Sequence, residues 1–259
     1  MRGAEEGRVR VREEPSDVRG ISLAPGRHLA ADAMRLSAAG VWAVSWSGGK
    51  DSMLALDRAV RAGLDIRYLV TLYDPALGRV RFHGTPIAVL EGQAAALGCE
   101  LLALAASWDR FDRVFRDGLD ALIQRGVTGM IFGNIHLADV RAWYEERVVA
   151  HGLRHHEPLW GGAPLALLEE VIARGYRAHL VSVDTTRLPP SWLGRALDTA
   201  CAAELAQRPG VDPCGERGEY HTLVTDGPLF HQPLSIRSGV THADGHFLLL
   251  DSELGIGSG

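Results

Sequence analysis

The chain has 259 residues, 46% of them hydrophobic, and a formal net charge of −5, which suits one large domain or two smaller ones. The acidic balance makes nucleic acid an unfavoured partner, and no apolar run approaches the roughly 18 residues of a membrane span. The three cysteines lie far apart without CxxC spacing, which argues against a disulfide framework or zinc site and favours a cytoplasmic location.

Residues 1–38 mix charges with prolines and glycines and lack a sustained apolar period, so we predict a flexible N-terminal extension. Beyond it, short apolar runs alternate with segments of helical spacing. Strands are predicted over 41–46, 66–72, 101–106 and 127–132, and helices over 51–62, 85–97 and 108–124. This alternation implies parallel strands with right-handed crossovers, and hence a doubly wound α/β domain over residues 39–136.

The second half keeps the mixture of helices and strands but is less regular. Helices are predicted over 139–151, 165–174 and 191–206, and strands over 178–183, 221–224 and 247–250. A loop rich in glycine and proline covers residues 208–218. We therefore predict a second, smaller α/β domain over residues 137–259, which binds the substrate.

The first predicted strand and helix are joined by the hexapeptide Ser47-Gly48-Gly49-Lys50-Asp51-Ser52. Its two glycines let the backbone approach an anion, and its amide N–H groups and the N-terminus of the next helix attract phosphate. Lys50, the one lysine among 27 basic residues, adds a full positive charge. A plain strand-to-helix turn is the alternative interpretation. A Walker loop is excluded, since it would need glycine at Val44 and Ser or Thr at Asp51.

The hexapeptide resembles the PP-loop of the N-type ATP pyrophosphatases. Two further segments narrow the resemblance: Gly133-Asn134-Ile135 with the Glu157-Pro158-Leu159-Trp160-Gly161 run, and the long segment from Gly210 to Thr222. Together these motifs resemble the diphthine–ammonia ligase family and its prokaryotic relatives, over roughly residues 41–233. The resemblance implies an adenine nucleotide alpha hydrolase-like sheet and cleavage of ATP between the α- and β-phosphates.

The implied activity is an ATP-dependent amide synthesis. A substrate carboxylate attacks the α-phosphorus, pyrophosphate leaves, and ammonia displaces AMP from the acyl adenylate, with Mg²⁺ on the phosphates. The expected partners are ATP, ammonia or ammonium, and a carboxylate-bearing substrate such as a modified protein side chain. Diphthine is such a side chain and carries a trimethylammonium group. A homodimer is compatible with the sequence, which does not determine the oligomeric state.

The resemblance also implies roles for individual residues. Lys50, Asp51 and Ser52 are the candidate catalytic residues, and Asp51 is the candidate Mg²⁺ ligand, with capping of the helix as the alternative. The candidate ATP-binding residues are Ser47, Gly48, Gly49, Lys50, Asp51, Ser52, His83, Gly133 and Asn134. The candidate substrate-binding residues are Asp139, Arg141, Glu157, Trp160, Asp212, Cys214, Gly215, Glu216, Gly218, Glu219, His221 and Thr222.

Two features of this set leave alternatives open. The carboxylates of the segment over residues 212–221 bind a cationic substrate, ammonium or Mg²⁺, or else they satisfy backbone N–H groups of a structural turn. Asn134 stands where the family usually has aspartate, so it lacks a negative charge that would help to hold a metal ion or ammonium. Two other functions therefore stay open: a PP-loop sulfur-transfer enzyme acting on tRNA through Cys214, and a non-catalytic ATP-binding module.

Overall fold

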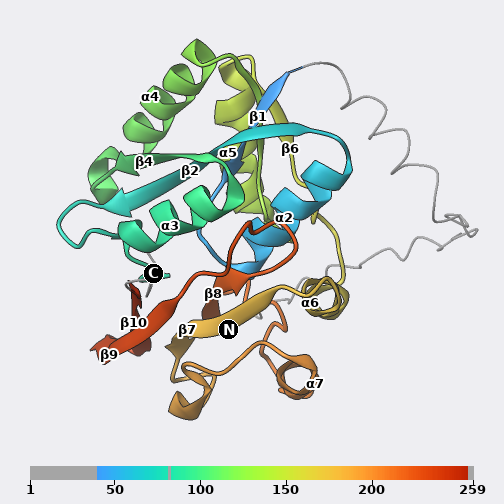
Figure 1. Ribbon diagram of the computed structural model, residues 1–259, viewed down its shortest axis with the longest axis vertical. Helices are drawn as coiled ribbons and strands as arrows, with labels where there is room; N and C mark the ends of the chain where they lie inside the picture. The colour runs from blue at the N-terminus through green and yellow to red at the C-terminus, as the bar shows by residue number, and fades with distance from the viewer. Residues whose placement is uncertain (1–39, 81–82, 256–259) are drawn as a thin grey trace, which may run out of the picture. The chain divides into compact units, whose positions relative to one another are not determined.

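The computed structural model describes residues 40–80 and 83–255, so the predicted extension over residues 1–38 lies outside it. The described residues form two β-sheets with their helices (Figure 1). The elements of the first part are β1 (Val41–Ser45), α2 (Lys50–Arg61), β2 (Asp65–Asp74), β3 (Arg79–Val80), α3 (Ile87–Leu97), β4 (Glu100–Ala105), η1 (Trp108–Arg110), α4 (Phe111–Gln124), β5 (Val127–Ile131), α5 (Ala138–Ala150) and β6 (Arg154–His156). Those of the second part are α6 (Pro164–Ala173), β7 (Arg177–Asp184), η2 (Pro190–Trp192), α7 (Thr199–Ala206), β8 (Tyr220–Asp226), β9 (Ile236–Asp244) and β10 (Phe247–Leu254).

The first sheet is built around β1. Its parallel strands run in the order β4-β2-β1-β5-β6, and the short β3 pairs antiparallel with the end of β2. Val44 of β1 lies between Leu69 of β2 and Ile131 of β5. Because the chain winds outward from β1 in both directions, the topological switch point lies between β1 and β5. The predicted doubly wound parallel sheet is thereby confirmed.

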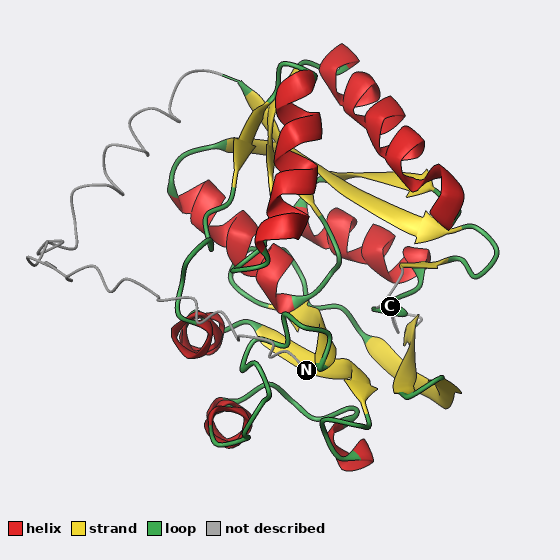
Figure 2. Cartoon of the chain, turned by 180° about the vertical axis from the view of Figure 1, so that it is seen from behind, coloured by secondary structure: helices red, strands yellow, loops and turns green. Residues whose placement is uncertain are grey.

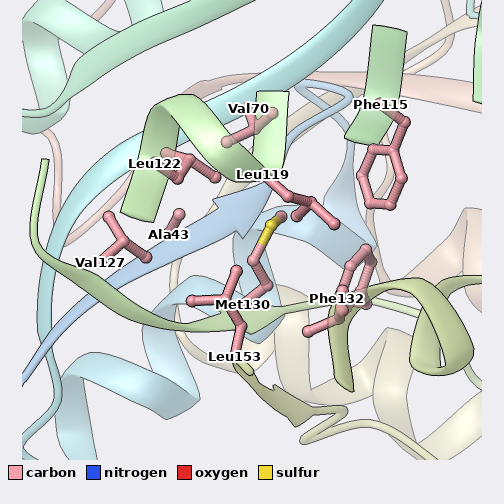
Figure 3. Close-up of a cluster of buried hydrophobic side chains, with 10 residues drawn as sticks. Ala43, Val70, Phe115, Leu119, Leu122, Val127, Met130, Phe132 and Leu153 are labelled. Carbon is pink, nitrogen blue, oxygen red and sulfur yellow. The ribbon is translucent and has the colours of Figure 1, made fainter. Parts of the chain in front are cut away.

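Helices cover both faces of this sheet, with α2 and α3 on one side and α4 and α5 on the other (Figure 1). Figure 3 shows the core beneath α4, where Phe115, Leu119 and Leu122 pack against apolar side chains of the central strands. This spacing places one apolar stripe of α4 on the sheet, and each fully buried side chain contributes about 1.5–3 kcal/mol. Gly118 lies in the same stripe, and a larger residue would not fit there, because its Cβ would lie 2.5 Å from the Leu104 side chain of β4.

The second sheet is antiparallel, with the order β8-β7-β10-β9 (Figure 2). It is tied to the first part by a backbone hydrogen bond from Val224 of β8 to Gly48 (2.9 Å), and the connection between β8 and β9 adds one from His231 to Ala96 of α3 (2.8 Å). The domain division after residue 136 stays a prediction. The strand β6, which follows that position, pairs with β5 of the first sheet.

The helix predicted over residues 191–206 is wrong in its first half. The chain forms the 3-10 turn η2 and a further turn at Leu193 and Gly194, and α7 begins only after Asp198, whose side chain accepts a hydrogen bond from Cys201 N at 2.8 Å. The physical reason is an alternative backbone partner. Gly194 takes a left-handed conformation (φ 78°) and donates to Leu180 O of β7, as Leu197 does to Ala178 O.

Three strands, β3, β6 and β9, were not predicted from the sequence. Two of them have two or three residues, too few for an alternating pattern to emerge. Within residues 40–80 and 83–255, no helix combines the length and the apolar character that crossing a membrane requires.

Candidate nucleotide-binding site

The hexapeptide predicted to bind phosphate, hereafter the phosphate loop (residues 47–52), joins β1 to α2 at the carboxyl edge of the first sheet. Gly49 is the N-cap of α2, so the first amide N–H groups of that helix point out of its N-terminus. Gly48 has a φ of 79°, a conformation that L side chains rarely adopt. The loop thus presents a concave row of donors beside the switch point between β1 and β5.

Two elements hold the phosphate loop from outside. Gln93 of α3 is fully buried and donates from Nε2 to Gly48 O (3.0 Å) and to Val224 O (2.7 Å). Its Oε1 accepts a hydrogen bond from Trp46 Nε1 at 2.9 Å. On the other side Thr222 of β8 accepts from Lys50 N at 3.0 Å. The second sheet therefore forms part of the wall that fixes the loop.

Lys50 is the buried cation of the site, with 3% of its side chain exposed. Its ammonium donates to Asp51 Oδ2 at 2.8 Å and to the carbonyl of Cys214, and lies 5.0 Å from the ring centroid of Tyr220. Burial acts to lower the pKa of Lys50, but Asp51, Tyr220 and Cys214 together outweigh it, and the pKa is raised above its usual value. The site therefore holds a permanent positive charge with a counter-ion beside it.

A cavity of about 350 Å³ opens along the phosphate loop and the carboxyl ends of β1, β2 and β5. It brings together most of the residues predicted from the sequence: Ser47, Gly49, Lys50, Asp51, Ser52, His83, Gly133, Asn134, Cys214, Gly215, Glu216, His221 and Thr222. The remaining predicted residues are not among those that line it: Gly48, Asp139, Arg141, Glu157, Trp160, Asp212, Gly218 and Glu219.

Two buried polar atoms on the cavity wall, Thr71 Oγ1 and His83 Nδ1, have no hydrogen-bond partner within the described part of the chain. The ring of His83 stacks on that of His221, with centroids 4.2 Å apart. Burial, assisted by the charge of Lys50, lowers the pKa of His83 to about 4, and burial with His83 beside it lowers that of His221 well below its usual value. Both rings are neutral at pH 7, and unsatisfied polar atoms there favour a ligand that completes their hydrogen bonding.

The loop over residues 212–219, hereafter the acidic loop, uses two of its carboxylates on its own backbone. Glu219 is fully buried and accepts from the backbone N–H groups of Asp212 (2.9 Å) and Arg217 (3.1 Å). Asp212 accepts from Cys214 N at 2.8 Å and lies 3.1 Å from His136 Nε2. For these two residues the structure favours the interpretation of a structural turn over that of a cation site.

Glu216 is the carboxylate of the acidic loop that faces the cavity. It accepts a hydrogen bond from Ile135 N at 2.9 Å, and burial raises its pKa. Gly215, with a φ of 67°, forms the turn that precedes Glu216. A larger residue would not fit at this position, because its Cβ would lie 2.8 Å from Tyr220 O. The thiol of Cys214 donates to Pro164 O at 3.0 Å, and burial raises its pKa to about 12. It is therefore an unreactive thiol.

Asn134 connects the cavity to a cluster of side chains around the buried Glu157. Its Nδ2 donates to Glu157 Oε1 at 2.7 Å, and the Glu157 side chain is 2% exposed. Arg141 Nε lies 3.6 Å from Glu157 Oε2, and its guanidinium stacks on the ring of Trp160 at 4.6 Å. The predicted residues Arg141, Glu157 and Trp160 therefore lie together, one layer behind Asn134.

The fit of Mg²⁺ depends on the carboxylates that reach the cavity. No group of three or more His, Cys, Asp or Glu side chains in the described ranges is arranged to hold a metal ion. A phosphate-bound Mg²⁺ needs only one or two protein carboxylates, since phosphates and water supply the rest. Asp51, with 28% of its side chain exposed on the cavity, meets that requirement. Its role as a metal ligand stays a prediction.

Several residues of the site escaped prediction from the sequence. Gln93, which holds the phosphate loop without lining the cavity, had a usable signal, because it is a polar residue on the apolar face of a predicted helix. The aromatic, aliphatic and threonine lining had none, since such residues are ordinary core residues in any α/β sheet. They are Trp46, Val70, Thr71, Leu72, Val80, Phe111, Phe132, Val140, Tyr144 and Tyr220.

Comparisons with known proteins agree with this architecture. The family model described as the diphthamide synthase N-terminal domain matches residues 40–155, and that of the diphthamide synthase C-terminal domain matches residues 163–250. A zebrafish (Danio rerio) diphthine–ammonia ligase is 31% identical over 228 residues, which cover 78% of this chain and 89% of the relative. The bovine (Bos taurus) enzyme of that name is 37% identical over 90 residues (33% of this chain, 34% of the relative), and the human (Homo sapiens) one 36% identical over 83 (31% of each). The chain therefore belongs to the diphthine–ammonia ligase family.

Proposed function

We propose that this protein is an ATP-dependent ligase that adenylates the carboxylate of diphthine, or of a closely similar side chain, and amidates it with ammonia. The observation that carries the proposal is the buried ammonium of Lys50 within a glycine-rich loop at the switch point of the sheet. Family membership and the names of the relatives supply the substrate class.

In the proposed reaction the phosphate loop holds the β- and γ-phosphates of ATP. The N-terminus of α2 and Lys50 offset the charge that builds on the departing pyrophosphate, and the hydroxyl of Ser47 donates to its oxygens. The hydroxyl of Ser52 would do the same by giving up its hydrogen bond to Gly49 O (3.0 Å). Thr71 and His83 offer their unsatisfied polar atoms to the nucleoside. Mg²⁺ held by Asp51 would neutralise phosphate charge.

The chemistry then proceeds in two steps. A carboxylate oxygen of the acceptor attacks the α-phosphorus, and the bond between the α-phosphorus and its bridging oxygen breaks to release pyrophosphate. Ammonia next attacks the acyl carbon, and AMP leaves with the former carboxylate oxygen while ammonia loses a proton. The neighbouring carboxylate Glu216, whose pKa is raised by burial, is suited to accept that proton.

The sulfur-transfer alternative is less well supported by the site. A persulfide carrier needs an accessible thiolate. The thiol of Cys214 is instead buried and forms a hydrogen bond to Pro164 O, and burial raises its pKa to about 12. The alternative of a non-catalytic module rests on Asn134. In this chain Asn134 forms a hydrogen bond with the buried Glu157 and leaves Lys50, Asp51 and Ser52 on the cavity, so it does not remove the groups needed for ATP cleavage.

The proposal is tested by tracing the oxygen atoms of the acceptor carboxylate with an isotope label. The protein is incubated with ATP, Mg²⁺, ammonium and a diphthine-bearing acceptor protein whose carboxylate is labelled with ¹⁸O. We expect AMP and pyrophosphate in equal amounts, with one label atom in AMP and an amide on the acceptor. Release of ADP and orthophosphate, or AMP without label, would contradict the adenylation mechanism.

A further inference from the structure

The nucleotide cavity offers hydrogen-bond donors and hydrogen-bond acceptors from different segments of the chain. The phosphate loop lines it with the donors of Ser47 and Lys50. Asn134, which follows β5, and Glu216 of the acidic loop also line it, and both side chains carry oxygen acceptors. The donors suit the phosphates of ATP, whereas the acceptors suit a second ligand that carries N–H or O–H groups.

The orientation of the Asn134 amide is fixed by a buried carboxylate. Asn134 Nδ2 donates to Glu157 Oε1 at 2.7 Å, and the Glu157 side chain, which is 2% exposed, does not line the cavity. An ionised carboxylate only accepts hydrogen bonds, so the NH₂ end of the amide turns toward Glu157. The opposite end, Oδ1, is left for the cavity, and no residue in the described part of the chain donates to it.

Glu157 is itself held in place by two nitrogen-bearing side chains. Arg141 Nε lies 3.6 Å from Glu157 Oε2, and His155 Nε2 lies 3.3 Å from Glu157 Oε1. The ring of His155 is buried and stacks on that of Phe132, with centroids 5.0 Å apart. Because a guanidinium carries donors and no acceptor, Arg141 requires an oxygen at this position. The contacts from Arg141 through Glu157 to Asn134 therefore have one polarity, with the last acceptor on the cavity.

Glu216 supplies a second open acceptor beside Asn134. Its Oε1 accepts a hydrogen bond from Ile135 N at 2.9 Å, and Ile135 directly follows Asn134. Its Oε2 forms no hydrogen bond or ion pair with another described residue. The two open acceptors, Asn134 Oδ1 and Glu216 Oε2, therefore belong to the same part of the cavity.

A small ligand with N–H groups on several sides matches such a pair of acceptors, and ammonia is the co-substrate of that kind. Mg²⁺ also binds oxygen, but a phosphate-bound Mg²⁺ is already served by Asp51 in the proposed function. The amide oxygen of Asn134 is a neutral acceptor, so it binds ammonia without favouring the protonated, unreactive form. Glu216 then lies beside the nitrogen from which it takes a proton in the proposed reaction.

On the premise of the proposed function, we propose that Asn134 Oδ1 and Glu216 Oε2 form the subsite for ammonia, with Glu157 as the positioning residue that turns the amide oxygen of Asn134 toward the cavity. The phosphate loop would then hold ATP, and this subsite would hold the nitrogen nucleophile.

The first experiment observes the subsite without any reaction. Asn134 is the one asparagine of the chain, so labelling with ¹⁵N-asparagine gives a single side-chain NH₂ group to follow by NMR. Ammonium chloride is titrated into the full labelled chain, and tetramethylammonium chloride at equal ionic strength is the probe that lacks N–H groups. We expect a saturable shift of the Asn134 signal with ammonium and none with tetramethylammonium.

The variant Glu157→Gln tests the positioning role. Arg141 takes the oxygen of the new amide, so the new NH₂ group faces Asn134 and turns the Asn134 oxygen away from the cavity. Ammonium binding should weaken by about tenfold. Glu145→Gln is the matched control, because it removes a carboxylate that lies 3.3 Å from the same Arg141 but does not line the cavity, and it leaves ammonium binding unchanged.

The second experiment measures turnover with a diphthine-bearing acceptor. Glu157→Gln raises the KM for ammonium by about tenfold and leaves the KM for ATP unchanged. The double variant Asn134→Asp with Glu157→Gln reverses the hydrogen bond, because the new amide donates to the new carboxylate, whose other oxygen faces the cavity. It restores the KM for ammonium to within about threefold of wild type, a rescue that a merely structural role of Glu157 does not predict.

The outcomes separate this inference from the proposed function. Normal amidation by wild type with an unchanged KM for ammonium in Glu157→Gln overturns the subsite alone. Glu157-dependent binding of ammonium without amidation by wild type overturns the proposed function alone. Equal shifts with ammonium and tetramethylammonium, or a Glu157→Gln protein that needs more Mg²⁺ and no more ammonium, assign the acceptors to any cation or to the metal and overturn the inference.

Discussion

The phosphate loop and the acidic loop both combine glycines with charged residues, yet they use their polar groups in opposite directions. In the phosphate loop the backbone is held from outside by Gln93 and Thr222, which leaves the side chains of Ser47, Lys50 and Asp51 on the cavity. In the acidic loop the carboxylates of Asp212 and Glu219 turn inward and hold the backbone themselves. A charged loop is therefore free to bind a ligand only where other residues satisfy its backbone.

The largest expected effect tests the first half of this comparison. Lys50→Met removes the buried positive charge, and pyrophosphate release should fall by about 10²–10³-fold because the transition-state charge loses its partner. Rates are measured as acceptor-dependent pyrophosphate release, with circular dichroism as the check on folding. Lys50→Arg should not restore the rate, since a planar guanidinium does not fit the space between Asp51 and Cys214. A folded Lys50→Met protein with wild-type turnover would contradict the assignment of the loop.

The second half of the comparison predicts a loss of stability. Glu219→Ala leaves the buried N–H groups of Asp212 and Arg217 without acceptors, so the free energy of unfolding should fall by about 2–4 kcal/mol. Urea denaturation measures it. Glu216→Ala is the matched control, because Glu216 is half-buried and accepts one hydrogen bond, and its loss should be about 1 kcal/mol. If Glu219→Ala kept its stability and lost acceptor binding, the acidic loop would face a ligand after all.

A smaller effect is expected at the contact between the two sheets. Thr222→Val keeps the shape of the side chain but removes the acceptor of Lys50 N, which should cost about 1–2 kcal/mol and raise the KM for ATP by about three- to tenfold. Thr222→Ser retains the hydroxyl and should stay near wild type. An unchanged KM for ATP in Thr222→Val would mean that β8 does not help to position the phosphate loop.

The smallest expected effect is a pH dependence. The pKa of His83 is lowered from its ordinary value of 6.5 to about 4 in the folded chain. Between these two pH values the unfolded chain therefore binds more protons than the folded chain. The contribution of His83 to stability is therefore complete above about pH 6.5 and is lost as the pH falls toward 4. The melting temperature of wild type should fall more steeply over this range than that of His83→Gln. Parallel curves for the two proteins would contradict burial of a neutral imidazole.

Much of the first half of the fold was predictable because its signals are local. Short apolar runs, helical spacing and glycines at helix ends predicted β1, α2, β2 and α3 to within one or two residues. The predicted helix over residues 191–206 failed where Gly194 and Leu197 found backbone partners on β7, which lies outside any local window. The hydrogen-bond partners of Gln93 were hidden for the same reason, since Gly48 and Val224 are distant from it in the sequence.

The sequence by itself determined the phosphate loop, because a strand, two glycines, the lone lysine and a helix start are contiguous and their chemistry is local. The tertiary structure decided which charges face the cavity. It directed Glu219 into the backbone of its own loop, put Asn134 against Glu157, and packed Phe111 against Trp143. The physical reason is that hydrogen-bond satisfaction and ring packing depend on partners that only folding brings into contact.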